Sequence, residues 1–254
     1  MDYNNELFSY HSNNTPKENL PSFESHTHAK YELLFVFKGK GKFIIEDSEY
    51  LVRENSLFII PPGEYHVMKL DAKTDYHRCV VNFSSSVIAS FLGKKISLHQ
   101  ITDDKIRSII EKMDYYAKNY PPQAFDVLLP ALINEVLICA TVENGQSNDK
   151  NYVPPLVKRT IDYVKASLYT ELTAETIADA LFVSKSHLSH VFSKTMGISI
   201  MRYVTIKKVH EARSLLRKGL SITEVCDKLG YNSYTTFLRN YRDSFGTNPS
   251  ELKK

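Results

Sequence analysis

The chain contains 254 residues, of which 43% are hydrophobic and 24% are charged, and it carries a formal net charge of +3. The length suits two domains of ordinary size, and the composition is typical of a globular protein. There is no run of 18 apolar residues and no secretory signal pattern at the N-terminus, so the sequence argues against a membrane span and export and predicts a cytoplasmic protein.

The first third of the chain has the pattern of an antiparallel β-domain. Aromatic and β-branched runs occupy residues 31–37, 42–45 and 56–60, and residues typical of turns separate them. Strands at such short, regular intervals favour a small sandwich or barrel.

Four titratable residues accompany these strands. Because alternate residues of a strand share a face, His26 and His28 point together, and Glu32 joins them if the strand is unbroken. The turn Pro61-Pro62-Gly63 can bring His66 beside them. Phe35, Phe37 and Phe58 are candidates for the apolar wall of a ligand site inside the barrel. Phe35 and Phe37 lie an odd number of residues from Glu32, so these two can instead face outward.

The spacing of these residues resembles the two cupin motifs. The segments that match are His26-Thr27-His28-x(3)-Glu32-x(6)-Gly39 and Pro61-Pro62-Gly63-Glu64-Tyr65-His66, with Asn55 and Leu70 in place of the expected Gly and Asn. The resemblance implies a cupin-like barrel with the four side chains inside it. In metal-dependent cupins these positions bind one metal ion through imidazole and carboxylate groups.

The apolar period becomes helical from about residue 102. Ile106, Ile109, Ile110 and Met113 share one helical face, and a second helix is predicted at about 124–142. The apolar residues of the second helix cover more than one stripe, which predicts a homodimer contact, unless its own domain wraps the helix. They are Val127, Leu128, Leu129, Ala131, Leu132, Ile133, Val136, Leu137, Ile138 and Ala140.

A polar segment then separates two regions of opposite charge. Residues 1–151 contain 16 Lys and Arg against 20 Asp and Glu, whereas residues 152–254 contain 16 against 9. We predict an effector-sensing and dimerisation domain at 1–145, a linker at 146–155 and a second domain at 156–254. The basic charge of the second domain suggests a polyanionic partner, although an ordinary basic surface is the alternative.

The second domain contains an internal repeat. Ile177, Ala178 and Leu181 align with Val225, Cys226 and Leu229 at an offset of 48, and the following segments align at 49, so the extra residue falls in a turn. Each copy predicts a short helix, a turn and a second helix ending at a glycine. This is a helix-turn-helix, present twice, with a connecting helix at about 199–218.

Residues 156–254 resemble the DNA-binding domain of the AraC/XylS family of bacterial regulators. The resemblance rests on Ser184-x(3)-Leu188-Ser189-x(2)-Phe192 and on Gly230-Tyr231-x(5)-Phe237-x-Arg239-x-Tyr241-x(4)-Gly246-x(2)-Pro249. It implies a ligand-responsive transcriptional regulator, an activator of an operon for a sugar or related metabolite, with RNA polymerase as a further partner. AraC-like sensors bind a small organic effector, so we expect His26, His28, Glu32 and His66 to bind the effector, with no cofactor and no metal.

In a helix-turn-helix the second helix enters the major groove, where polar residues near its N-terminus meet base edges. Arg239 is the strongest candidate for a base contact, because a guanidinium can donate two bonds to guanine. The predicted DNA-binding residues are Lys185, Ser186, Ser189, His190, Lys194, Tyr234, Thr235, Leu238, Arg239 and Arg242, of which Lys185, Lys194 and Arg242 are expected at phosphates.

The predicted fold class is therefore α+β with two domains, a cupin-like β-barrel with flanking helices and an all-α domain with two helix-turn-helix motifs. Two other functions compete with the effector-responsive regulator. A metal-binding cupin sensor or enzyme fused to a DNA-binding domain is the first, but no further acid–base set accompanies the four residues, so we expect no enzyme. A constitutive architectural DNA protein is the second, and it would not need a barrel.

Overall fold

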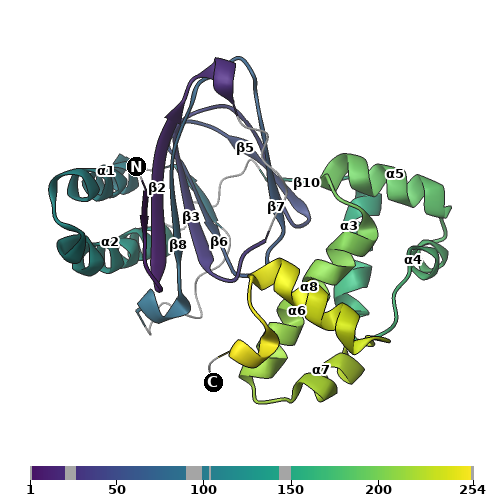
Figure 1. Ribbon diagram of the computed structural model, residues 1–254. Helices are drawn as coiled ribbons and strands as arrows, with labels where there is room; N and C mark the ends of the chain where they lie inside the picture. The colour runs from purple at the N-terminus through teal and green to yellow at the C-terminus, as the bar shows by residue number, and fades with distance from the viewer. Residues whose placement is uncertain (1, 21–26, 90–98, 103, 143–149, 253–254) are drawn as a thin grey trace.

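The computed structural model describes residues 2–20, 27–89, 99–102, 104–142 and 150–252. Figure 1 shows four layers: a helical pair, a first sheet, a second sheet facing it, and the helical C-terminal domain. The predicted fold class, an N-terminal β-domain with flanking helices followed by an all-α domain, is confirmed.

Both sheets are antiparallel. The larger sheet has the order β1-β2-β8-β3-β6-β9, and the smaller has the order β10-β5-β4-β7. The strands of the two sheets are β1 (Asp2–Asn4), β2 (Phe8–Thr15), β3 (Tyr31–Lys38), β4 (Gly41–Ile45), β5 (Ser48–Val52), β6 (Ser56–Ile60), β7 (His66–Leu70), β8 (Tyr76–Phe83), β9 (His99–Thr102) and β10 (Lys150–Tyr152). Strand β10, in the middle of the predicted linker, pairs with β5.

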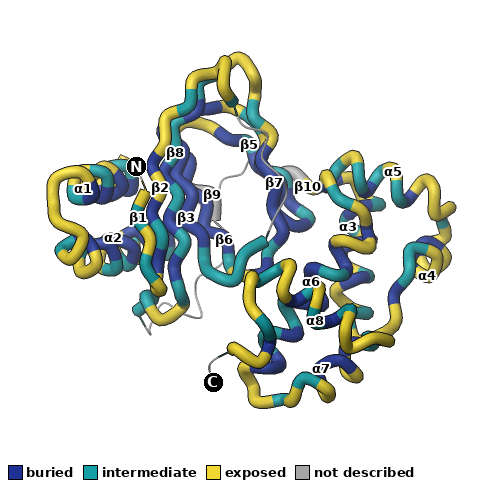
Figure 2. Tube along the Cα trace, in the orientation of Figure 1, coloured by how far each residue is buried: buried dark blue, intermediate teal, exposed yellow. Residues whose placement is uncertain are grey.

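Alternate side chains of β3 belong to two different hydrophobic cores. Leu34 and Val36 belong to the core between the sheets, together with Phe58. Phe35 and Phe37 belong to the core on the opposite face. Because these two residues lie outside the space between the sheets, they cannot line a ligand site there, and the outward alternative is the one observed. Figure 2 shows the buried residues along both facing sheets.

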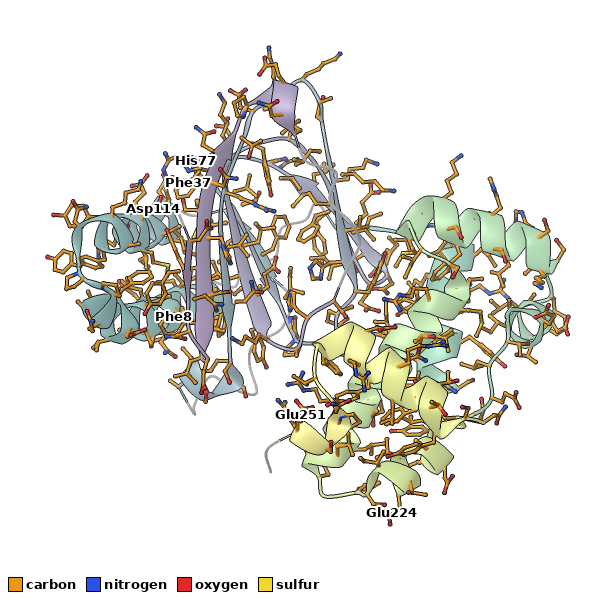
Figure 3. All side chains as sticks on the ribbon, viewed as in Figure 1. Phe8, Phe37, His77, Asp114, Glu224 and Glu251 are labelled. Carbon is orange, nitrogen blue, oxygen red and sulfur yellow. The ribbon has the colours of Figure 1, made fainter. Side chains whose placement is uncertain are left out.

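Two helices cover the outer face of the larger sheet, α1 (Asp104–Asn119) and α2 (Pro122–Val142). Figure 3 shows Phe8, Phe37 and His77 near these helices, and the Phe37 ring stacks on that of His77 with centroids 4.4 Å apart. By length and composition α2 could span a membrane, but it is a core helix of this sheet. Most of the apolar residues that the sequence analysis assigns to this helix are buried in that core: Leu129, Leu132, Ile133, Val136, Leu137 and Ala140.

The C-terminal domain consists of α3 (Pro155–Ala166), α4 (Ala174–Ala180), α5 (Lys185–Met196), α6 (Ile200–Arg217), α7 (Ile222–Lys228) and α8 (Tyr234–Phe245). The predicted repeat is present, because α7 begins 48 residues after α4 whereas α8 begins 49 after α5. The predicted caps form as well. Thr173 and Ser221 each close a capping box, and Gly197 and Gly246 end α5 and α8 in the left-handed conformation.

Two cores hold the two helix-turn-helix units. One comprises residues of α3, α4, α5 and the first half of α6, and the other comprises the second half of α6, α7 and α8. Lys208 joins them, since its buried ammonium donates to the carbonyls of Thr170 at 2.9 Å and Leu229 at 2.6 Å. The turns of the units differ: Gly230 has φ +63°, whereas its counterpart Phe182 has φ +57° although it carries a bulky side chain.

Candidate functional site

A cavity of about 410 Å³ opens beside the predicted effector residues. This volume lies in the range of small-molecule sites. Seven of its nine lining residues are polar or charged, and they come from β2, β3, β8 and the segment before β3: Ser9, His11, His28, Ala29, Lys30, Glu32, Arg78, Val80 and Asn82.

Three of the four predicted effector residues lie together. His28 Nε2 is 2.8 Å from Glu32 Oε2, and His66 Nε2 is 3.8 Å from the same oxygen. Glu32 and His66 are buried, whereas His28 is partly exposed to the cavity. His26 falls outside the described residues. The Pro-Pro-Gly turn therefore brings His66 to Glu32, as the sequence predicted.

The hydrogen bonds of the two imidazoles define what the cluster can bind. His28 Nδ1 donates to the Lys30 carbonyl at 2.7 Å, and His66 Nδ1 donates to the Glu64 carbonyl at 2.9 Å. The Nε2 atom of each ring is thereby turned to the same carboxylate. Burial lowers the pKa of His28, but the hydrogen bond and charge of Glu32 outweigh burial, and the net shift of the pKa is upward. The cluster thus stabilises a positive charge between its members.

A metal ion is one such charge. The ligand atoms of His28, Glu32 and His66 all lie within 4.8 Å of one another. Two imidazole nitrogens and a carboxylate, with each second ring nitrogen held by a carbonyl, form a donor set that suits a divalent transition metal. These residues fit a metal, and they equally fit a hydroxylated ligand that donates and accepts hydrogen bonds.

Sequence reasoning missed the polar residues contributed by β8. Arg78 and Asn82 line the cavity, and Asn82 Oδ1 is buried without a hydrogen-bond partner among the described residues. The signal was available, because Arg78, Val80 and Asn82 alternate with the buried Cys79, Val81 and Phe83. An unused buried acceptor favours a ligand that donates a hydrogen bond.

The residues predicted to contact DNA bases lie on α5 and α8, and most of them are exposed. Ser186, His190, Tyr234, Thr235 and Arg239 are exposed, whereas Ser189 and Leu238 are partly buried. Leu238 packs against the core of its own unit, which leaves only part of it for a base. The apolar partners of the same helices, Leu188, Phe192, Phe237 and Tyr241, are fully buried.

The three predicted phosphate contacts differ in their surroundings. Lys194 is exposed. Lys185 pairs with Glu175 of α4, and the guanidinium of Arg242 donates to Asn248 Oδ1 at 2.7 Å in the last turn of α8. Lys194 is therefore the freest of the three to meet a phosphate.

Comparison with known families decides the affiliation of the chain. A family described as an AraC-like ligand binding domain matches residues 16–124, and a helix-turn-helix domain family matches residues 177–254. The chain belongs to the AraC family of transcriptional regulators. It is thus a DNA-binding transcriptional regulator with a ligand-binding domain.

Relatives and solved structures of this AraC family chain cover most of its length. The HTH-type transcriptional regulator YfiF of Bacillus subtilis is 23% identical, over 88% of this chain and 76% of YfiF. The Msm operon regulatory protein of Streptococcus mutans is 25% identical, over 88% and 84%. The crystal structure of ToxT from Vibrio cholerae aligns over 97% of each chain at 14% identity, with a TM-score of 0.41.

In this AraC family regulator the two domains meet at Glu46, which sequence reasoning also missed. Its carboxylate accepts hydrogen bonds from Tyr203 at 2.5 Å and Lys207 at 2.7 Å, and Lys165 lies 3.0 Å away. Burial raises the pKa of Glu46, but the two lysines outweigh burial and lower the pKa to about 2. Glu46 is also a non-glycine residue with φ +51°, a costly conformation that the docked domain helps to fix.

Further contacts hold the first helix-turn-helix unit of the regulator against the smaller sheet. Tyr65 donates to the Met196 carbonyl at 2.6 Å and Lys69 to the Thr195 carbonyl at 3.0 Å, so both grip the C-terminal end of α5. Ile44, Tyr65 and Val67 belong to the core of that unit. Tyr65 is adjacent in sequence to His66, which connects the predicted effector cluster to a predicted DNA-reading helix by one peptide bond.

Proposed function

We propose that the chain is an effector-responsive regulator whose β-domain senses a sugar or related polyhydroxylated metabolite and thereby controls DNA binding at an operon promoter. The observation that carries the proposal is the continuity from His66 through Tyr65 to the C-terminal end of α5. The relatives named as the Msm operon regulatory protein and the lactose operon transcription activator of Staphylococcus xylosus support the metabolite class. We propose that it activates transcription with RNA polymerase, acts in the cytoplasm and catalyses no reaction.

DNA reading has a direct test. We expect both units to contact one face of a duplex, with α5 and α8 about 34 Å apart, one turn of DNA, as footprinting would show. Arg239→Ala should weaken binding by about 1–3 kcal/mol and relax one base position, because a bidentate contact to guanine is lost. Lys194→Ala is the matched control, since losing a phosphate contact weakens all sequences alike and flattens the salt dependence. Unchanged affinity and preference in Arg239→Ala would refute base reading.

Effector binding has its own variant. In a folded His28→Ala/His66→Ala protein we expect the effector-dependent change in DNA binding to disappear, because the polar groups around Glu32 are lost. A thermal-shift screen of the full chain against sugars and organic acids identifies the ligand, since binding to the native state raises the melting temperature. Lys42→Ala, which removes a surface ion pair with Glu49 outside the cavity lining, is the control expected to keep the response. A full response in the double variant would place the sensing site elsewhere.

A metal sensor is the second candidate, and the 4.8 Å grouping of His28, Glu32 and His66 supports it. His26, the fourth cupin position, would complete the set. Adding Zn²⁺ or Mn²⁺ to chelator-treated protein distinguishes the two: a metal site predicts a rise in melting temperature that the double variant loses, whereas a sugar site predicts no response to either ion.

We further propose a homodimer formed through α2. After the burial of its core stripe, α2 still exposes Val127 at 74% and Ile138 at 39%, beside the exposed Ala131. Sedimentation of the full chain should give a dimer at micromolar concentration, and Val127→Lys/Ile138→Lys should shift it to monomer, because a lysine is costly in an apolar contact. Met201→Lys, which charges an exposed apolar residue of α6, is the control. A wild-type monomer at high micromolar concentration would exclude this contact.

A further inference from the structure

A second cavity, of about 510 Å³, lies at the junction of the two domains that Figure 1 shows. One wall is the segment around the Pro-Pro-Gly turn, and the others are the end of α3 and the C-terminal half of α6. The lining residues are Ala29, Pro62, Gly63, Glu64, Lys165, Leu168, Lys207, His210, Glu211, Arg213, Ser214, Arg217 and Lys218. This cavity is separate from the effector cavity, with which it shares Ala29.

The lining is strongly cationic. Five lysines and arginines face two carboxylates, Glu64 and Glu211. Lys165 and Lys207 are already paired with Glu46. Among the described residues, no ion pair involves the remaining three cations, which are Arg213, Arg217 and Lys218. The excess positive charge is therefore concentrated on the last turns of α6.

Arg213 is the most informative of these cations. Its guanidinium lies over the Phe245 ring, 4.4 Å from the centroid, and its Nε is buried with no hydrogen-bond partner among the described residues. Burial lowers the pKa of Arg213, and Arg217 lowers it further. A buried guanidinium nitrogen without an acceptor is costly, and a bound anion would supply that acceptor.

The pKa of the neighbouring His210 is consistent with the positive charge of this cavity. His210 accepts or donates one hydrogen bond, with Thr27 Oγ1 at 2.8 Å. Burial lowers its pKa to about 4, and the charges of Lys207 and Arg213 contribute to that shift. A neutral His210 can still donate to or accept from a ligand, while the arginines supply the charge.

We propose that this interdomain cavity binds the phosphate group of a small metabolite, with Arg213, Arg217 and Lys218 as the phosphate ligands. An arginine guanidinium can donate two parallel hydrogen bonds to two phosphate oxygens. Three cations in one cavity carry more positive charge than a single carboxylate ligand would neutralise. The site is distinct from the proposed sugar site, and its occupant touches both domains. The turn at Gly63 and Glu64 forms one wall of the phosphate cavity, and its backbone also bonds to the His28 carbonyl and to the His66 ring.

Calorimetric titration of the full chain with inorganic pyrophosphate tests the proposal. We expect saturable binding that Arg213→Gln/Arg217→Gln weakens by at least about tenfold, because two charge-assisted contacts are lost. Lys112→Gln/Lys118→Gln removes the same charge from exposed positions on α1 and should bind like the wild type. If the first double variant does not fold, Arg217→Gln/Lys218→Gln changes only exposed residues and should show the same weakening.

Three results would overturn the proposal: no saturable heat in the wild type, equal binding by the cavity and control variants, or stoichiometric displacement of pyrophosphate by a DNA duplex. The last result would make the cavity a contact for DNA phosphate and not for a metabolite. Undiminished pyrophosphate binding in the presence of duplex supports the metabolite site. Neither binding arm uses the effector cavity, so failure here leaves the proposed function intact.

Discussion

Replacing Glu46 with alanine should lower the free energy of unfolding by about 3–5 kcal/mol, because the change leaves the buried ammonium of Lys207 without its carboxylate. The side chain of Lys207 is only 11% exposed, and Tyr203 and the Tyr65 amide lose their acceptor as well. Urea denaturation of the full chain measures the loss, and limited proteolysis between the domains reports undocking as faster cleavage.

Asp75→Asn is the matched control for Glu46→Ala. Asp75 pairs with Lys38 at 2.8 Å, but both side chains are well exposed. Exposed pairs contribute about 0–1 kcal/mol, so this variant should resemble the wild type. Equal losses in the two variants would mean that Glu46 does not hold the domains together.

The sequence predicted those parts of the molecule that local patterns specify. Aromatic and β-branched runs between turn residues located β3 and β6, and the four-residue apolar spacing located α5 and α8. Parity also distinguished Glu32, which faces inward, from Phe35, which faces the helices. In each case the residues that decide the outcome are neighbours in the chain.

The junction between the domains could not be predicted in the same way. Glu46 lies in a short turn where a glutamate normally faces water, and its partner Lys207 is 161 residues away. No local pattern distinguishes this glutamate from Glu49 on the adjacent strand, which pairs at the surface with Lys42. Long-range packing decides which carboxylate is buried. Removing a carboxylate from water is costly, and this cost is offset only where several hydrogen-bond donors contact the same carboxylate.

The same junction should weaken in mild acid through His210. Its ring meets Thr27 and Phe245, and Gly63 approaches so closely that an added Cβ would lie 2.9 Å from Nδ1. The positive charges of Lys207 and Arg213 oppose protonation of the ring. The pKa of His210 is lowered from 6.5 to about 4, with burial as the largest cause.

Because the folded pKa lies below the unfolded value, His210 contributes stability that is fully present above pH 6.5 and is lost as the pH falls toward 4. One pKa unit corresponds to about 1.4 kcal/mol, so we expect a loss of about 2 kcal/mol between pH 7 and pH 5. Glu46, whose pKa is near 2, keeps its charge throughout this range. The pKa of His28 is shifted upward, so its protonation acts in the opposite direction.

Comparing the wild type with His210→Gln isolates this contribution, because His28 is present in both proteins and Glu46 keeps its charge in both. Glutamine keeps a side-chain amide that can bond to Thr27 but does not ionise in this range. The free energy of unfolding should fall more steeply with acid in the wild type, by about 2 kcal/mol over these two pH units. Parallel pH profiles would show that His210 is protonated in the folded protein, and the positive field attributed to Lys207 and Arg213 would then be too weak to exclude a third charge.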